Sequence, residues 1–150
     1  MTVRKMTRED KIAVIDMMRV FYASDAVMTN GSEEIFQNDT EACVSDSPYA
    51  EGYVFQDGTE ICGYAMIAKS FSTEFGKPCI WIEDIYVKPP YRSQGIGRRF
   101  LDTLFDTYKS RVVYRLEAET DNRVAVALYR KCGFDVLPYL EMIKNTTDDT

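Results

Sequence analysis

The chain of 150 residues lacks several features that mark particular classes of protein. It has no histidine, the side chain most often used as a metal ligand or catalytic base near neutral pH. Its four cysteines show no short repeat spacing, so neither a zinc site nor a disulfide framework is indicated, and we expect free thiols. No stretch approaches the roughly 20 apolar residues that cross a bilayer, and the N-terminus has no apolar secretion core. These absences predict a cytoplasmic protein with no metal and no membrane partner.

Positive charge is also scarce. The chain has 18 Lys and Arg against 24 Asp and Glu, for a formal net charge of -6. Non-specific nucleic-acid binding depends on basic residues that displace counterions from phosphates, so we expect no nucleic-acid partner. The acidity would suit a cationic acceptor such as a polyamine or a lysine side chain, although it could equally serve solubility alone.

The length and composition are those of one globular domain. Apolar residues make up 45% and charged residues 28% of the chain, which is enough to bury a core without disulfides or metal. We expect a single domain over residues 1–145 and a disordered polar tail over 146–150.

Hydrophobic periodicity predicts strands that alternate with helices. Thr7 and Ser32 are the expected N-caps of the first two helices, and Asp57-Gly58 is a strong hairpin signal. The order predicts an α/β domain with a mixed sheet and helices on both faces. Strands are expected at 3–6, 53–56, 60–71, 79–87, 112–118 and 134–144, and helices at 7–22, 32–44, 97–108 and 122–132.

The most informative segment is Tyr91-Arg92-Ser93-Gln94-Gly95-Ile96-Gly97-Arg98-Arg99, between a buried strand and an amphipathic helix. Gly95 and Gly97 let the backbone turn tightly and let its N–H groups approach an anion, and the helix N-terminus adds partial positive charge. Such a turn can bind a pyrophosphate, or it can be a plain strand-to-helix connection. A dinucleotide fingerprint would need a small residue where Phe100 stands, and a P-loop would need Gly-Lys-Ser/Thr, which is absent.

This segment resembles the coenzyme A loop of the GNAT superfamily of N-acetyltransferases, whose pattern is Arg/Gln-x-x-Gly-x-Gly/Ala. Arg92, Gly95 and Gly97 match that pattern. The resemblance continues downstream in order and spacing, and the upstream strand is similar to that of the diamine and polyamine acetyltransferases. The further matching positions are Trp81-Ile82-Glu83-Asp84-Ile85-Tyr86-Val87, Leu116-Glu117, Asn122, Ala125, Tyr129 and Gly133-Phe134.

The resemblance implies a mostly antiparallel sheet of six to seven strands, flanked by about four helices and splayed where coenzyme A binds. It implies acetyl-CoA as cosubstrate, an amine of a small molecule or protein as acceptor, and a homodimer as a common assembly. The N–H of Ile85 or Tyr86 would polarise the thioester carbonyl. The implied cofactor-binding residues are Ile85, Tyr86, Val87, Arg92, Ser93, Gln94, Gly95, Ile96, Gly97, Arg98, Asn122 and Tyr129.

Three residues are candidates for catalysis. An amine attacks only when it is neutral, so a proton acceptor is needed, and carboxylates are the natural choice in a chain without histidine. Glu83 and Asp84 should face opposite sides of a regular strand. The resemblance favours Glu83 as base through a water, while a bulge could bring Asp84 into the pocket instead. The alternative is that one of them pairs with a buried arginine.

By the same resemblance, Tyr129 would protonate the departing thiolate, although a tyrosine at this spacing could also be helix packing. Tyr22, Asp25 and Glu34 are possible acceptor contacts. Two other functions stay open: an acyl-coenzyme A-binding regulatory module of the same fold, and an unrelated nucleotide-binding α/β domain.

Overall fold

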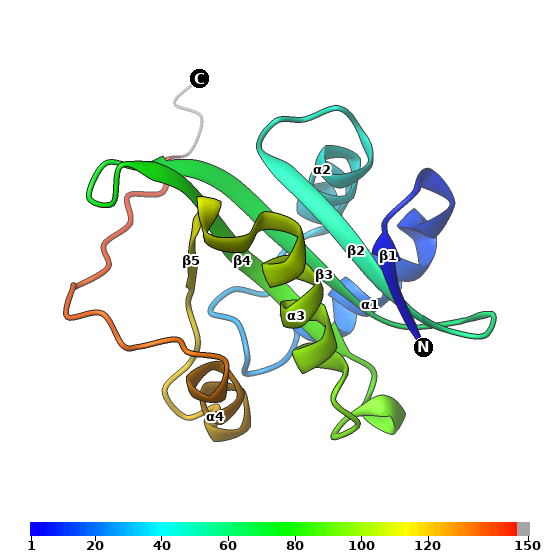
Figure 1. Cartoon of the computed structure of the whole chain (residues 1–150). Helices are drawn as coiled ribbons and strands as arrows, with labels where there is room; N and C mark the ends of the chain where they lie inside the picture. Colours follow the sequence, from blue (N-terminus) through cyan, green and yellow to red (C-terminus); the bar gives the residue numbers. More distant parts are fainter. Residues whose placement is uncertain (147–150) are drawn as a thin grey trace.

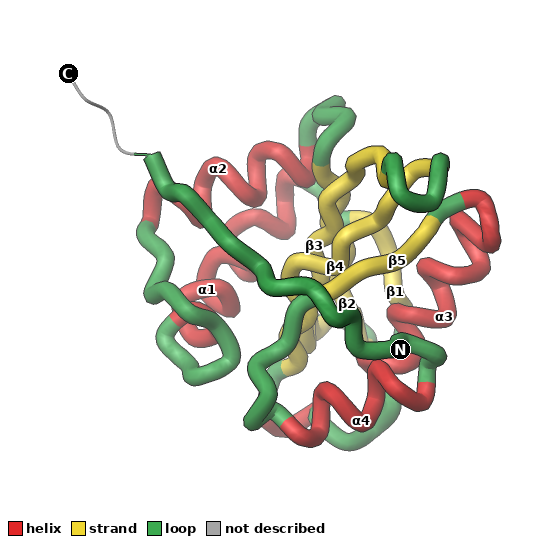
Figure 2. Tube along the Cα trace, turned by 90° about the vertical axis from the view of Figure 1, so that its left-hand side faces the viewer, coloured by secondary structure: helices red, strands yellow, loops and turns green. Residues whose placement is uncertain are grey.

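The computed structural model describes residues 1–146, which form a twisted sheet with helices on both of its faces (Figures 1 and 2). The strands are β1 (Thr2–Lys5), β2 (Ala50–Asp57), β3 (Glu60–Ser72), β4 (Lys77–Val87) and β5 (Val113–Leu116). The α-helices are α1 (Lys11–Tyr22), α2 (Glu33–Val44), α3 (Ile96–Tyr108) and α4 (Arg123–Lys131), and single 3-10 turns lie at η1 (Arg8–Asp10), η2 (Pro89–Tyr91) and η3 (Lys109–Arg111).

The sheet follows chain order, β1-β2-β3-β4-β5. The first four strands form an antiparallel meander, and β5 runs parallel to β4 because α3 crosses over between them. The predicted hairpin at Asp57-Gly58 is confirmed: it joins β2 to β3, and Gly58 has φ +61°. The sheet is therefore mixed, as the order of strands and helices predicts, and mostly antiparallel, as the resemblance implies.

Two hydrophobic cores flank the sheet. On one face, Phe100, Leu101 and Leu104 of α3 pack on β2, β3 and β4. On the other face, α1 and α2 pack on the same strands around Tyr64 and Met18. Each such buried side chain contributes about 2 kcal/mol through removal from water. Strand β4, which carries two of the candidate catalytic residues, Glu83 and Asp84, therefore lies between the two cores.

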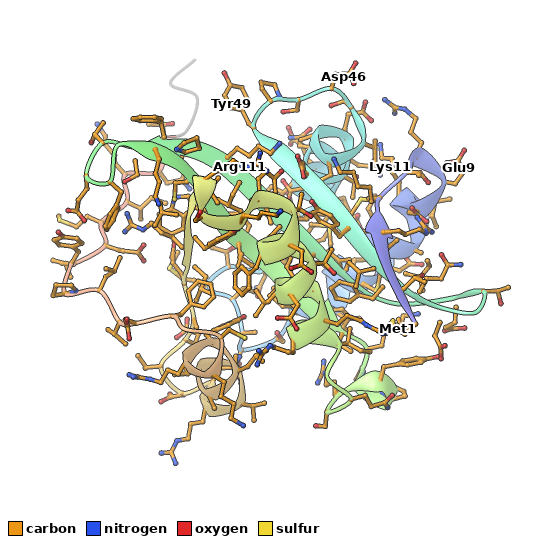
Figure 3. The ribbon with its side chains drawn as sticks, viewed as in Figure 1. Met1, Glu9, Lys11, Asp46, Tyr49 and Arg111 are labelled. Carbon is orange, nitrogen blue, oxygen red and sulfur yellow. The ribbon has the colours of Figure 1, made fainter. Side chains whose placement is uncertain are left out.

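The predicted starts of α2 and α4 are confirmed by their caps. The hydroxyl of Ser32 accepts a hydrogen bond from the N–H of Ile35 at 3.2 Å, and the Asn122 side chain accepts one from Ala125 at 3.3 Å. At Thr7 the chain first makes the turn η1, where the Thr7 N–H donates to Asp10 Oδ2 at 2.8 Å, and α1 follows. Figure 3 shows the charged side chains of Glu9 and Lys11 at the periphery of this end of the molecule.

The expected count of six to seven strands is wrong, because residues 1–146 contain five. The missing strand is the one predicted over 134–144, which has no regular secondary structure here. Pro138 interrupts that segment and offers no N–H to a neighbouring strand. Apart from the half-buried Phe134, its large apolar side chains stay exposed, with Leu140 85% and Met142 87% exposed. Strand β5 also ends at Leu116, before the predicted Ala118.

Three further predictions meet the structure in different ways. All four cysteine thiols are free, as expected. None of the helices within residues 1–146 is long and apolar enough to span a bilayer. Of the predicted tail, residue 146 is irregular and residues 147–150 lie outside the described part of the chain.

Candidate active site

The turn before α3 presents a row of main-chain donors. Ser93 and Gly95 both have positive φ, +61° and +77°, and the first helical hydrogen bond runs from the N–H of Arg99 to the Gly95 carbonyl at 3.0 Å. Within residues 1–146, the N–H groups of Gln94 to Arg98 have no hydrogen-bond acceptor. A non-glycine residue such as Ser93 rarely adopts positive φ without a reason. Successive free N–H groups at a helix N-terminus form an anion-binding site.

Side chains around this turn fix the loop. Arg92 Nε donates to the Val87 carbonyl at 2.8 Å, and its guanidinium lies 5.6 Å from the centre of the Tyr86 ring. Gln94 Nε2 donates to the Pro90 carbonyl at 3.1 Å. Arg98 pairs within its own helix with Asp102, at 3.2 Å. A small pocket of about 240 Å³ lies beside the turn; its lining residues are Met1, Asp57, Tyr91, Gln94, Gly95, Ile96 and Arg99.

Gly97 has a packing role that the sequence does not reveal. A Cβ added at this position would lie 3.2 Å from Leu128 Cδ2 of α4, closer than ordinary contact. A Cβ at Gly95 would meet nothing within 4 Å, so that position is limited by its positive φ alone. Gly97 therefore lets α3 and α4 approach each other, and Gly95 shapes the turn.

Strands β4 and β5 are paired over only part of the length of β4. Their pairing ends at Ile82 with Leu116, although β4 continues to Val87. The N–H of Lys88 donates to Cys62 on the β3 side at 2.8 Å. Because successive N–H groups of a strand point in opposite directions, those of Ile85 and Val87 face the edge that β5 has left open. An extended ligand can pair with that edge as an added strand would.

A β-bulge in β4 places the two candidate carboxylates. Met66 of β3 pairs with Asp84 and the next residue, Ile67, pairs with Ile82, so Glu83 is the extra residue of the bulge. Asp84 is 4% exposed and faces the α1 and α2 side, whereas Glu83 keeps contact with solvent. Among residues 1–146, Glu83 makes no hydrogen bond or ion pair. The β-bulge considered as an alternative is therefore present in the strand. It leaves Asp84 buried and Glu83 in contact with solvent.

The buried Asp84 is held by hydroxyl groups. The Tyr22 hydroxyl donates to Oδ1 at 3.0 Å and to Oδ2 at 3.2 Å, and the Tyr64 hydroxyl donates to Oδ2 at 2.8 Å. Burial raises the pKa of Asp84, against the opposing effect of these hydrogen bonds. Burial, and then the charge of Asp84, raise the pKa of Glu83. Burial with both negative charges raises the pKa of Asp39, on α2, to about 6.

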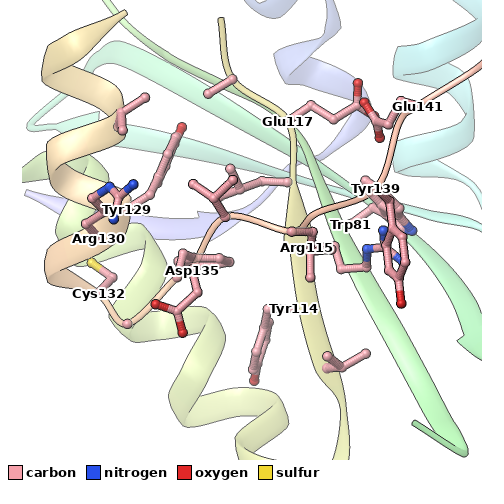
Figure 4. Close-up of a pocket in the computed structure, with 18 of the residues that line it drawn as sticks. Trp81, Tyr114, Arg115, Glu117, Tyr129, Arg130, Cys132, Asp135, Tyr139 and Glu141 are labelled. Carbon is pink, nitrogen blue, oxygen red and sulfur yellow. The ribbon is translucent and has the colours of Figure 1, made fainter. Parts of the chain in front are cut away.

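The predicted residue Tyr129 lines a separate, larger cavity of about 870 Å³ between β5, α4 and the C-terminal segment (Figure 4). Burial raises the pKa of its hydroxyl, which has no hydrogen-bond partner within residues 1–146, and its ring packs at 6.0 Å against Phe134. Glu117 and Glu141 lie side by side at the other end of the close-up; burial, and then a hydrogen bond with Glu141, raise the pKa of Glu117.

The structure therefore gathers the predicted residues in part. Gly97 of the turn lies against Leu128 of α4, the helix that carries Tyr129, and Tyr129 lines the larger cavity together with Leu116, where the pairing of β4 and β5 ends. Glu83 lies at the bulge and does not line that cavity. Sequence reasoning missed Tyr64 and Asp39, and it named Glu117 only as a position that matches the family pattern. A signal existed for Asp39, since an aspartate on the same helical face as the buried Phe36 is unusual. Nothing in the sequence pairs Tyr64 with Asp84.

Known proteins with similar sequences and folds identify the family of this chain. The model of the Acetyltransferase (GNAT) family matches residues 15–134. N-alpha-acetyltransferase RimI of Mycobacterium tuberculosis is 40% identical over 89 residues, which are 59% of this chain and 54% of that protein, so the chain matches about half of its relative's length.

Two solved structures show the same fold at low sequence identity. A possible acetyltransferase from Clostridium difficile 630 has a TM-score of 0.83 and 16% identity, with 98% of each chain covered. AAC(6')-Iy, in complex with a bisubstrate analog, has a TM-score of 0.77 and 12% identity, with 97% of this chain and 98% of that chain covered. The match of the family model over most of the chain, together with the fold, shows that this chain belongs to the GNAT acetyltransferase family.

Proposed function

We propose that this protein transfers an acetyl group from acetyl-CoA to a primary amine of a small molecule or protein, by direct attack of the amine on the thioester. The observation that carries the proposal is the row of free N–H groups from Gln94 to Arg98 beside the open edge of β4. The row can bind the diphosphate of the coenzyme, and the N–H groups of Ile85 and Val87 can pair with its pantetheine arm.

The main chain of β4 also supplies a hydrogen-bond donor for the thioester carbonyl. Of the two residues that the sequence suggests for this role, Ile85 directs its N–H to the open edge, whereas the N–H of Tyr86 points toward β3. We therefore assign to Ile85 the hydrogen bond that polarises the thioester carbonyl and stabilises the oxyanion of the tetrahedral intermediate. In comparable sites, removing one such donor costs about 3 kcal/mol of transition-state stabilisation.

Glu83 is the proposed proton acceptor. It stands at the bulge with contact to solvent and with no hydrogen-bond partner among residues 1–146, and its raised pKa makes it a stronger base than an ordinary glutamate. Tyr129 is the proposed proton donor to the departing thiolate, since its hydroxyl is free to do so in the larger cavity. Asn122 caps α4 and so fixes the start of the helix that carries Tyr129.

A matched pair of variants tests the phosphate site. Aspartate and asparagine have the same shape and both tolerate the positive φ of position 95, so they differ in charge alone. We expect Gly95→Asp to weaken coenzyme A binding at least tenfold relative to Gly95→Asn, because a carboxylate beside the diphosphate repels it. Calorimetry with coenzyme A measures the difference. Equal affinity of the two variants would contradict the assignment of the turn.

A second measurement separates the enzyme from an acyl-coenzyme A-binding module. Steady-state thiol release is followed with a panel of a diamine, a lysine-containing peptide and peptides with a free amino terminus. Acetyl-CoA-dependent release with one of them supports the transferase. Tight coenzyme A binding with no release on any of them favours the module.

A further inference from the structure

Asp84 is an unusual residue for the centre of a sheet. It is buried at 4% exposure, and both of its oxygens accept hydrogen bonds from tyrosine hydroxyls. No ion pair to Asp84 is formed within residues 1–146. A buried carboxylate without a cation costs stability, so a chain that keeps one usually does so for a reason other than packing.

The two tyrosines reach Asp84 from different elements. Tyr22 is the last residue of α1, and Tyr64 stands on β3, two positions from Met66, the residue that pairs with Asp84. Their hydroxyl groups lie on the α1 and α2 side of the sheet, under the bulge that carries Glu83. The carboxylate of Asp84 is thereby fixed one residue away from the proposed base.

We propose that Tyr22 and Tyr64 are positioning residues for acetyl transfer: together they hold the Asp84 carboxylate beneath the bulge, where its negative charge acts on Glu83. The proposal rests on the function proposed above, which makes Glu83 the base. It gives Asp84 an electrostatic role and excludes it as the group that receives the proton of the amine.

Tyr22 itself is held firmly. Its ring lies 5.5 Å from that of Phe36 on α2, and a Cβ added at Gly31 would meet Phe36 at 2.6 Å and Tyr22 at 3.4 Å. The segment between α1 and α2 therefore closes tightly over these two rings. This packing leaves the Tyr22 hydroxyl little freedom, so its hydrogen bond to Asp84 persists without further cost in side-chain entropy.

The acidic groups around Glu83 all disfavour its ionised form. Asp84 stands beside it on β4, Asp39 approaches from α2 and Glu117 from beyond β5, and all three are acidic. Arg115 on β5 lies 4.6 Å from the Trp81 ring and forms no ion pair with Glu83. Negative neighbours disfavour the charged form of a carboxylate, and Asp84 is the charged group that raises the pKa of Glu83.

The sign of the expected change follows from this arrangement. Loss of a tyrosine hydroxyl removes a hydrogen bond that favours ionised Asp84, so Asp84 retains its proton to higher pH. Glu83 then has a neutral neighbour and loses its own proton at lower pH. Replacing Asp84 by asparagine should have the same effect on Glu83 directly.

The test is a carboxyl ¹³C NMR titration of the full chain with labelled glutamate, in wild type and in the variants Tyr22→Phe, Tyr64→Phe and Asp84→Asn. We expect the titration midpoint of Glu83 to fall by about 0.5 to 1 pH unit in all three. The acid limb of the pH profile of kcat/KM, measured with an acceptor from the panel above, should move to lower pH by the same amount. A role limited to packing would leave both midpoints in place.

Tyr53→Phe is the matched control. It removes a buried hydroxyl that donates to a carboxylate on the opposite face, Glu51, at 2.8 Å. The proposal is overturned if Asp84→Asn leaves the Glu83 midpoint unchanged, or if both Tyr22→Phe and Tyr64→Phe shift it no more than Tyr53→Phe does. Thermal melts identify a variant that has unfolded, and the other tyrosine variant then decides. Midpoints that shift as expected in a chain that acetylates nothing would overturn the proposed function and leave the coupling standing.

Discussion

Two groups of partly buried carboxylates lie on opposite faces of the sheet, and their surroundings move their pKa values in opposite directions. On the α3 face, burial alone would raise the pKa of Glu51, but hydrogen bonds from Lys69, Tyr53 and Tyr108 outweigh it and lower the pKa to about 2. On the other face, Asp84 accepts hydrogen bonds from tyrosine hydroxyls and has no cation beside it within residues 1–146, and burial raises its pKa. A cation makes the buried carboxylate of Glu51 part of the scaffold, while tyrosine hydroxyls alone leave Asp84 with a raised pKa and a charge that acts on the neighbouring Glu83.

The largest expected effect is a difference in activity between a variant on each face of the sheet. Glu83→Gln removes the proposed base, and we expect kcat/KM to fall at least a hundredfold, as for other general bases. Coenzyme A affinity should change less than twofold, because Glu83 makes no hydrogen bond or ion pair with the turn at Gln94 to Arg98. Glu51→Gln, assayed in parallel, should keep activity within a few-fold. Similar losses in the two variants would erase the distinction between the faces.

The next effect is a loss of stability expected on the α3 face, at Glu51. Glu51→Gln leaves Lys69 and two tyrosine hydroxyls without their charged acceptor, and we expect the free energy of unfolding at pH 7 to fall by about 2 kcal/mol. Because the pKa of Glu51 is lowered from 4.5 to about 2, its stabilisation is complete above pH 5 and is lost as the pH falls toward 2. Urea unfolding between pH 7 and pH 2 should show this loss in wild type and not in the variant.

Tyr129→Phe tests the proposed proton donor. Phenylalanine keeps the ring packing against Phe134 and removes the hydroxyl, so turnover should fall about tenfold while coenzyme A affinity stays within twofold. Single-turnover kinetics and calorimetry measure the two quantities. A change in melting temperature alone, with turnover preserved, would assign Tyr129 to packing.

The smallest expected effect is a gain in stability. The pKa of Asp39 is raised to about 6, so the folded chain disfavours the ionised form that prevails at pH 7. Asp39→Asn should therefore raise the free energy of unfolding by about 1 kcal/mol at pH 7, with solvent screening taken into account. The gain should vanish below pH 4, where Asp39 is protonated in wild type as well. Glu34→Gln, an exposed change on the same helix, serves as the control, and an equal gain there would contradict this account of Asp39.

The sequence predicts the turn before α3 better than the surroundings of Asp84. That turn depends on main-chain geometry, and main-chain geometry leaves a local pattern of glycines, as at Gly95 and Gly97. The same holds for the helix caps at Ser32 and Asn122, where each side chain bonds to a residue three positions ahead. Features of this kind need only neighbouring residues, so the pattern is sufficient.

The surroundings of Asp84 depend on contacts between elements that are distant in the sequence. Alternation alone cannot place Asp84, because the extra residue Glu83 reverses the facing of the strand at that point. The contacts of Asp84 with Tyr22 and Tyr64 span 62 and 20 residues. The error in the strand count has a similar origin. The residues of 134–144 suit a strand, but whether they pair with the edge of the short β5 depends on tertiary structure, which local sequence does not determine.

A crystal structure with bound coenzyme A tests the central claim most directly. We predict that the diphosphate lies within hydrogen-bond distance of the N–H groups of Gln94 to Arg98. The sulfur should emerge between β4 and β5, near Ile85 and within reach of Glu83 and Tyr129. A diphosphate bound elsewhere, or a sulfur remote from both side chains, would contradict the account.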